Sequence, residues 1–116
     1  MPTPTLKTLI PPTLIGNTMT TLGTVGASKT WRVKEMIFMN DDTGNVLVDF
    51  HYVPSGGSPS ATNKMFKGAS PNGLWLLPGE TRVLALDSVH EQGVSLRAIA
   101  SVNNKVSFCA SGAEIA

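Results

Sequence analysis

The sequence predicts an all-β protein: an antiparallel, jelly-roll-like β-sandwich with an extended arm at its N-terminus. Short segments of alternating apolar and polar residues recur about every ten residues, and turn residues separate them. No segment shows helical periodicity with a capping box over three turns. The 116 residues have room for one domain. We expect that domain over residues 18–116, and the connections between its strands stay open.

Seven or eight segments are predicted as strands. The clearest is 46–53. Its alternation places one set of side chains on one face, Val46, Val48, Phe50 and Tyr52, and the other set on the opposite face, Leu47, Asp49, His51 and Val53. Pro78 and Gly79 are placed as in a type II turn between two of the strands. The predicted strands cover residues 18–24, 29–40, 46–53, 63–67, 74–77, 81–86, 94–101 and 106–111.

The predicted strand 29–40 departs from simple alternation, which indicates a bulge or burial on both faces near its end. Its apolar residues fall into two sets: Met36 and Phe38 on one face, and on the other Trp31, Val33, Ile37 and Met39.

Residues 1–17 are predicted to form the extended arm. They hold four of the eight prolines, which exclude a helix or a central strand. Two interpretations stay open: the arm folds back along its own domain, or it reaches onto a neighbouring subunit, where a proline-stiffened segment loses little entropy on binding. The predicted partner-binding residues are the aliphatic ones: Leu6, Leu9, Ile10, Leu14 and Ile15.

Composition limits the partners. Nine basic and eight acidic side chains give a net charge of +1, and the basic residues are spread along the chain, so nucleic acid is not an expected partner. Charged residues make up only 15% of the chain, so its surface can be buried against protein at little cost in ion desolvation. With no secretory signal and no apolar run near the roughly 18 residues that span a bilayer, we expect synthesis in a cytoplasm and no membrane contact.

No catalytic chemistry is expected. The sequence has no nucleophile elbow, P-loop, zinc-protease or dinucleotide-binding motif. Asp49 and His51 share a strand face and could share a metal only with a third ligand from elsewhere, for example His90 or Glu91. The turn 41–45 has oxygen ligands but lacks the glutamate of a calcium loop. Cys109 is expected to be a buried, inert thiol. We therefore predict no enzyme activity, no cofactor and no metal.

Three further side chains are candidates for specific contacts. Trp31 and Trp75 could stack on a sugar ring, although packing in a core or an interface is the more common role of such residues. For Glu114, Arg97 and Arg82 are the suggested ionic partners.

The order of these segments resembles the small β-sandwich structural proteins of tailed bacteriophage virions. The match spans roughly residues 20–116, with Val94 where an aspartate is more usual and Ala113 where a valine is more usual. Within it, segment 53–57 matches a "vPsGG" loop, 77–81 a "PGE" turn and 111–115 a terminal "sGvEi". The other segments that carry the resemblance are 31–40 and 90–101.

The resemblance implies a virion component, in first place a capsid decoration (cement) protein that bridges subunits of the major capsid protein. The alternatives are a tail, baseplate or neck component and a carbohydrate-binding module. Expected partners are the major capsid protein and other copies of this chain, as a dimer or trimer.

Overall fold

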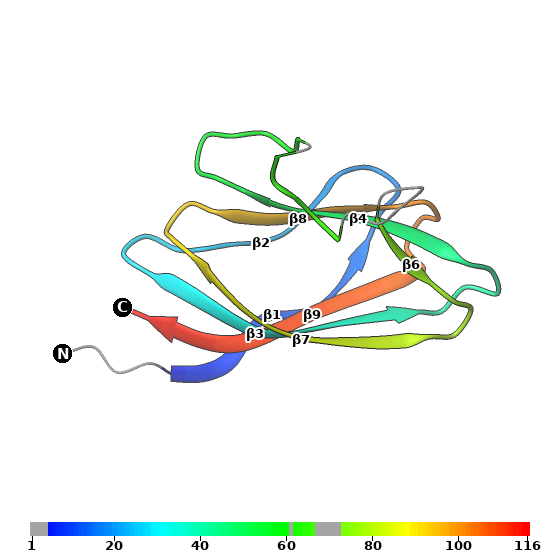
Figure 1. The fold of residues 1–116 in the computed structure, drawn as a ribbon, viewed down its shortest axis with the longest axis horizontal. Helices are drawn as coiled ribbons and strands as arrows, with labels where there is room; N and C mark the ends of the chain where they lie inside the picture. Colours follow the sequence, from blue (N-terminus) through cyan, green and yellow to red (C-terminus); the bar gives the residue numbers. More distant parts are fainter. Residues whose placement is uncertain (1–4, 61, 67–72) are drawn as a thin grey trace.

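The computed structural model describes residues 5–60, 62–66 and 73–116. Its described residues are all-β and form two antiparallel sheets packed as a sandwich (Figure 1). One sheet has the order β1-β9-β3-β7, and the other has the order β2-β8-β4-β5, with β6 also paired to β4. The strands are β1 (Thr5–Ile15), β2 (Thr20–Thr24), β3 (Thr30–Asn40), β4 (Val46–Val53), β5 (Lys64–Met65), β6 (Leu74–Leu76), β7 (Thr81–His90), β8 (Ser95–Ala100) and β9 (Val106–Ile115).

The chain changes sheet at almost every connection. β1, β3, β7 and β9 lie in the first sheet, whereas β2, β4, β5, β6 and β8 lie in the second. Neighbours within a sheet are therefore distant in sequence, as where β9 lies between β1 and β3. This wiring, with the fourth position of the second sheet divided between β5 and β6, is that of a jelly roll. The predicted fold class is confirmed, and the structure supplies the connections that the sequence left open.

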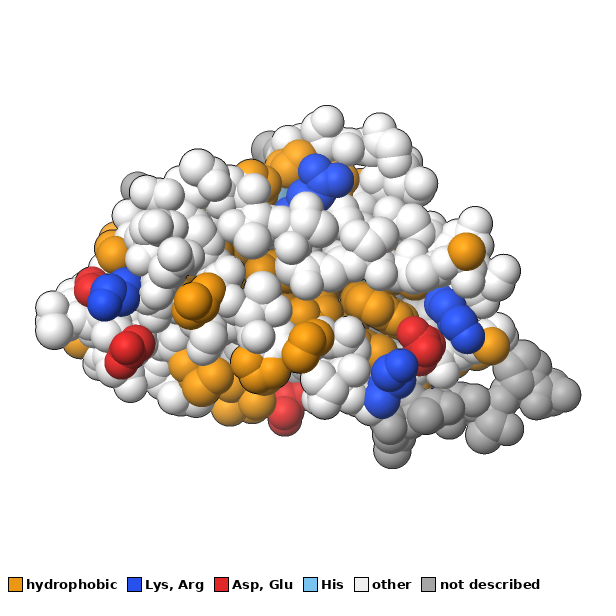
Figure 2. Space-filling view, turned by 180° about the vertical axis from the view of Figure 1, so that it is seen from behind, with side chains coloured by type: hydrophobic (Ala, Val, Ile, Leu, Met, Phe, Trp, Pro, Cys, Tyr) orange, Lys and Arg blue, Asp and Glu red, His pale blue; other side chains and the backbone are white. Residues whose placement is uncertain are grey.

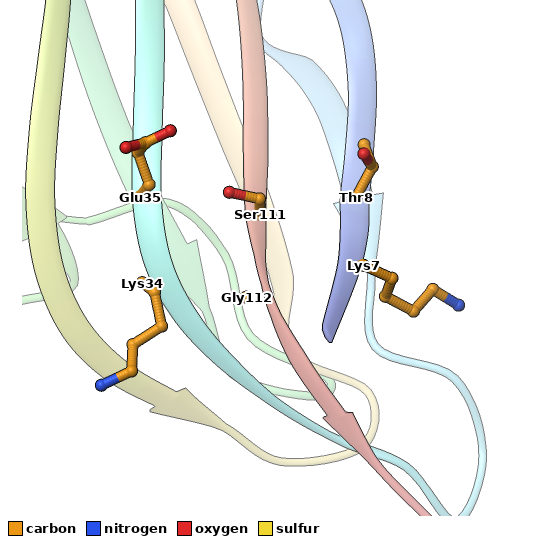
Figure 3. Close-up of a pocket in the computed structure, with 6 residues that line it drawn as sticks. All are labelled: Lys7, Thr8, Lys34, Glu35, Ser111 and Gly112. Carbon is orange, nitrogen blue, oxygen red and sulfur yellow. The ribbon is translucent and has the colours of Figure 1, made fainter. Parts of the chain in front are cut away.

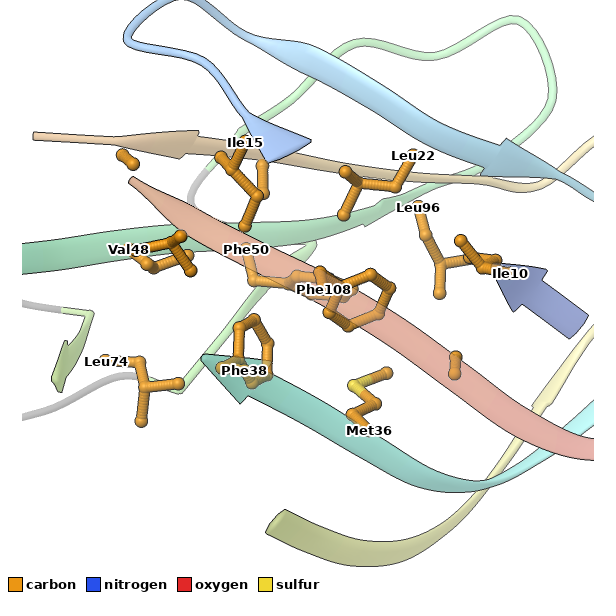
Figure 4. Close-up of a cluster of buried hydrophobic side chains, with 14 of the residues drawn as sticks. Ile10, Ile15, Leu22, Met36, Phe38, Val48, Phe50, Leu74, Leu96 and Phe108 are labelled. Atoms are coloured by element: carbon orange, nitrogen blue, oxygen red, sulfur yellow. The ribbon is translucent and has the colours of Figure 1, made fainter. Parts of the chain in front are cut away.

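The core lies between the two sheets, around three phenylalanines. Phe38 of β3, Phe50 of β4 and Phe108 of β9 are fully buried. Their ring centroids are 5.0 Å apart for Phe38–Phe108 and 5.3 Å apart for Phe50–Phe108, in tilted arrangements favourable to aromatic pairs. Figure 4 shows these rings surrounded by aliphatic side chains from both sheets. The sandwich is thus held by direct contacts between strands far apart in sequence.

β3 contains a bulge, one of the two predicted alternatives, but it lies near the middle of the strand and not near its end. The bulge reverses one predicted face assignment. Register shifts occur between Val33 and Glu35 against both neighbouring strands. Trp31 and Val33 before the shift point into the core. After it the buried positions are Met36, Phe38 and Asn40, while Ile37 and Met39 are only half-buried. The predicted shared face of Trp31, Val33, Ile37 and Met39 is therefore wrong, because the extra residue moves the last two to the outer side.

Residues 5–15 of the predicted arm form β1, the edge strand beside β9. An edge is where a strand tolerates proline, and the register shifts between Ile10 and Thr13, around Pro11 and Pro12. The side chain of Ile10 is buried over Gly23 of β2, where a Cβ atom would lie 2.9 Å from Ile10. In this structure the segment packs on its own domain.

Candidate interaction surface

The outward side of the β1-β9-β3-β7 sheet carries an apolar cluster at the end where β1 and β3 finish. Across the strands, Leu14 is opposite Ser107, which is opposite Met39. One row further in, Cys109 and Val83 flank Ile37 from either side. Leu14 and Val83 are 53% and 54% exposed, and the other apolar members are half-buried. We call this cluster the outer apolar patch: Leu14, Ile37, Met39, Val83 and Cys109.

Charged side chains lie toward the other end of the same sheet. The guanidinium of Arg32 donates two hydrogen bonds of 2.7 Å to the carboxylate of Asp87. Lys34 Nζ lies 3.3 Å from the same carboxylate. The hydrogen bonds from Arg32, with a smaller contribution from Lys34, hold the pKa of Asp87 well below its usual range. Asp87 thus offsets part of the positive charge of Arg32 and Lys34, and none of the five members of the outer apolar patch is itself a charged residue.

A shallow hollow of about 550 Å³ lies on this sheet, beside the charged end. In Figure 3, Lys7 and Lys34 point away from each other, and Glu35 points toward neither. A small-molecule site needs polar groups that converge on one point. The hollow does not have that arrangement; its lining residues are Lys7, Thr8, Lys34, Glu35, Ser111 and Gly112.

Seen from behind, the molecule has hydrophobic side chains across the middle of one side, and most of the charged side chains visible there lie nearer its two ends (Figure 2). Such clustering differs from apolar residues scattered singly over a surface, which carry no functional meaning. A surface on which hydrophobic side chains gather in this way is suited to contact with another macromolecule.

The five predicted arm residues do not share one environment in the structure. Leu9, Ile10 and Ile15 are buried in the core of their own chain. Leu14 faces outward in the outer apolar patch, and Leu6 is paired along the backbone with Ala113. Contact with another subunit stays a prediction. Among the four arm residues whose side chains the structure describes, Leu14 is the exposed one.

The candidate metal ligands have partners within the chain. Asp49 Oδ1 lies 3.1 Å from Lys64 Nζ, and His51 Nδ1 lies 2.8 Å from Asn63 Oδ1. In the turn after β3, Asp42 Oδ2 accepts a hydrogen bond from the Gly44 amide. Over the described ranges, no group of three histidine, cysteine or acidic side chains is placed to hold a metal ion.

The two tryptophans have different environments. Trp31 is 6% exposed, and its Nε1 donates a 3.0 Å hydrogen bond to Glu114 Oε2. Trp75, on the other sheet, is 43% exposed. Glu114 also contacts Lys7 at 3.2 Å, so the suggested partners Arg97 and Arg82 were wrong.

Cys109 lies on the outward side of β9 and is half-buried, not fully buried as predicted. Burial raises the pKa of its thiol, and the nearby charge of Glu35 adds to the effect. The thiolate is therefore disfavoured at neutral pH, consistent with an inert thiol.

The sequence analysis did not predict the outer apolar patch, although the residue pattern of β7 indicates an apolar outer face. Val83 and Ala85 alternate with Leu84 and Leu86, so both faces of this strand are apolar. An edge strand with one solvent-facing side would normally be polar on that side. The outward position of Ile37 and Met39 depends on the bulge in β3, whose place the sequence did not fix.

Among the part of the chain that the structure describes, no helix is long and apolar enough to cross a membrane. No family model and no curated protein matches the sequence.

Similar solved structures come from infectious bursal disease virus. The VP2 subviral particle matches with 18% identity and a TM-score of 0.45, over 98% of this chain and 32% of that chain. The Gx strain matches with 17% identity and a TM-score of 0.46, over 99% and 31%. The T13 viral particle matches with 13% identity and a TM-score of 0.47, over 97% and 30%. This chain thus spans about a third of the length of each matched chain.

Proposed function

We propose that this chain is a virion structural protein that decorates a capsid by packing its outer apolar patch onto the major capsid protein. The outer apolar patch is the observation that carries the proposal. The jelly-roll wiring supports it, because this architecture recurs in viral capsid domains, although a fold alone does not define a function. The segment order shared with small virion proteins of tailed bacteriophages adds further support.

Packing on a shell subunit would remove the outer apolar patch from water. Burial of apolar surface contributes roughly 25 cal/mol per Å² before the costs of association. Leu14 and Val83 are the most exposed members, and neither carries a charge that binding would have to desolvate. In this proposal Leu14 makes the arm's contact with the capsid, while Ile10 and Ile15 hold β1 in place from the core side.

The proposal is tested with purified chain and with shells that lack it. We expect saturable binding by the wild-type chain and at least tenfold weaker binding by Leu14→Lys, because the new charge would have to be desolvated. Trp75→Ala is the control, since Trp75 is similarly exposed but lies on the other sheet. Wild-type binding by Leu14→Lys, or no binding by the wild-type chain, would overturn the proposal.

Two other functions, a tail, baseplate or neck component and a carbohydrate-binding module, predict different experimental results from those of a capsid decoration protein. Imaging of intact particles would show a tail, baseplate or neck component as density on the tail alone, instead of copies spread over the shell. The exposure of Trp75 favours a carbohydrate-binding module as the second candidate. A glycan array would support that candidate only if binding occurs and is lost in Trp75→Ala.

A further inference from the structure

The two edges of the β1-β9-β3-β7 sheet differ in how well they are protected against pairing with an additional strand. At one edge, β1 contains Pro11 and Pro12 and two register shifts, features that prevent further strand pairing. At the other edge, β7 pairs with β3 alone among the described residues. β7 contains no proline and no lysine, and it is ten residues long. Its free side therefore offers backbone N–H and C=O groups to another strand.

The side chains of β7 are also incompletely buried. No residue of β7 before His90 is fully buried, and Val83 and Val89 are more than half exposed. On the inner side, Leu84 and Leu86 pack against the core but remain partly accessible. A strand added beside β7 would cover apolar groups on both faces of the sheet at once. Such coverage is the usual gain in strand addition.

The low net charge of the β7 edge favours an uncharged strand as its partner over an acidic or basic peptide. Arg82 is the one charged side chain in segment 81–86. Its Nε donates a 2.6 Å hydrogen bond to Glu80 Oε2, which neutralises it. An acidic or basic peptide would therefore gain no electrostatic attraction here, whereas a second neutral β7 would meet no repulsion.

The register defines where the pairing would be most regular. The shift opposite Val33 and Glu35 places two β7 residues, Leu86 and Asp87, against the single residue Lys34. Segment 81–85 is free of this irregularity, and Val83 is its central residue. A two-fold axis near Val83 would pair the regular segments of two copies in antiparallel orientation.

We propose that β7 of one copy pairs with β7 of a second copy, which joins their β1-β9-β3-β7 sheets into one continuous sheet across a two-fold axis. The partner is a second copy of this chain. The pairing uses backbone groups of β7 together with Val83, Leu84 and Leu86, and it does not require a shell.

Sedimentation of the purified full chain over a range of concentrations tests the self-pairing. We expect a reversible dimer whose dissociation constant rises at least tenfold in Val83→Lys, because the substitution introduces a lysine near the same lysine of the partner. Leu14→Lys is the matched control, with nearly equal exposure on the opposite edge strand, and it should dimerise as wild type does. A circular dichroism melt checks that both variants fold.

Hydrogen exchange gives a readout that needs no substitution. Amides in segment 81–85 should exchange at least tenfold more slowly at high protein concentration than at low concentration, while those in β1 should not change. A monomer at all concentrations, a dimer abolished by Leu14→Lys but kept by Val83→Lys, or protection confined to β1 would each overturn the proposal. Self-association is measured without shells, so a dimer that fails to bind shells would contradict the proposed function alone.

Discussion

Trp31 and Glu114 are 83 residues apart in sequence and joined by a 3.0 Å hydrogen bond from the indole Nε1 to the carboxylate. The other carboxylate oxygen of Glu114 contacts Lys7 at 3.2 Å. Because these residues belong to β3, β9 and β1, one carboxylate ties three neighbouring strands together near the end of the sheet.

We predict that Glu114→Ala lowers the Tm more than Glu114→Gln does. The alanine leaves the indole N–H of Trp31 without its acceptor, whereas glutamine keeps an acceptor and loses only the charge opposite Lys7. Thermal melts at low and high salt measure both effects. Equal Tm values for the two variants would contradict the role assigned to the Trp31 hydrogen bond.

Gly112 is predicted to tolerate no side chain. A Cβ atom there would clash with the backbone carbonyl oxygen of Arg32, and the β3 backbone cannot move away as a flexible side chain could. We expect Gly112→Ala to reduce the free energy of unfolding by about 1–3 kcal/mol or to prevent folding. Gly26→Ala is the control, since a Cβ there meets only the side chain of Lys29 at 3.7 Å. Urea denaturation measures both, and equal stability would refute the close approach.

Ile15→Ala is predicted to destabilise the chain by about 2–5 kcal/mol, because its side chain is fully buried in the core. Leu14→Ala, one residue earlier and exposed, should change stability by less than about 0.5 kcal/mol. For the same reason we expect deletion of residues 1–17 to unfold the domain. Urea denaturation provides the test. A stable, folded truncated domain would show instead that β1 is dispensable for the core.

Stability is predicted to fall as the pH decreases below the ordinary pKa of histidine. Burial lowers the pKa of His90 from 6.5, and its ring lies 5.6 Å from that of Tyr52, centroid to centroid. The unfolded chain therefore binds a proton at a higher pH than the folded chain does, so acidification through 6.5 favours unfolding. In His90→Gln this part of the pH dependence should disappear. Denaturation curves between about pH 5 and 7 avoid most carboxylate titration; unchanged slopes would refute the assignment.

The sequence predicted those parts of the fold that depend on local pattern. The boundaries of β4 agree with the prediction, and its side chains alternate in burial from Val46 to Phe50. Beyond Phe50 the pattern departs from the predicted alternation, because His51 and Val53 are buried whereas Tyr52 is exposed. The outward position of Ile37 was missed because one extra residue near Lys34 reverses every later side chain, and alternation alone does not locate that residue. The partner of Glu114 was missed because it depends on the pairing of β9 with β3, which is not a local property.

For the arm, too, the local sequence predicted some features, whereas others depend on contacts between distant segments. Prolines in residues 1–17 excluded a helix and a central strand, and the edge position of β1 agrees with that exclusion. Whether the segment packs on its own domain depends on the space above Gly23, which receives Ile10. That space becomes evident only when β1 and β2 are placed in three dimensions. The outer apolar patch likewise draws its members from four strands.

The central position of β9 has a consequence for synthesis on the ribosome. β1 and β3 are made early, yet both need β9 between them before either gains its neighbour on that side. The inner faces of these strands, including Met36 and Phe38, therefore wait for β9 to leave the exit tunnel, after every other strand that the structure describes. Closing such distant contacts is slow and leaves apolar surface open to aggregation meanwhile. Slower translation would lengthen that exposed interval, so the yield of folded chain should depend on chaperones that hold nascent apolar segments.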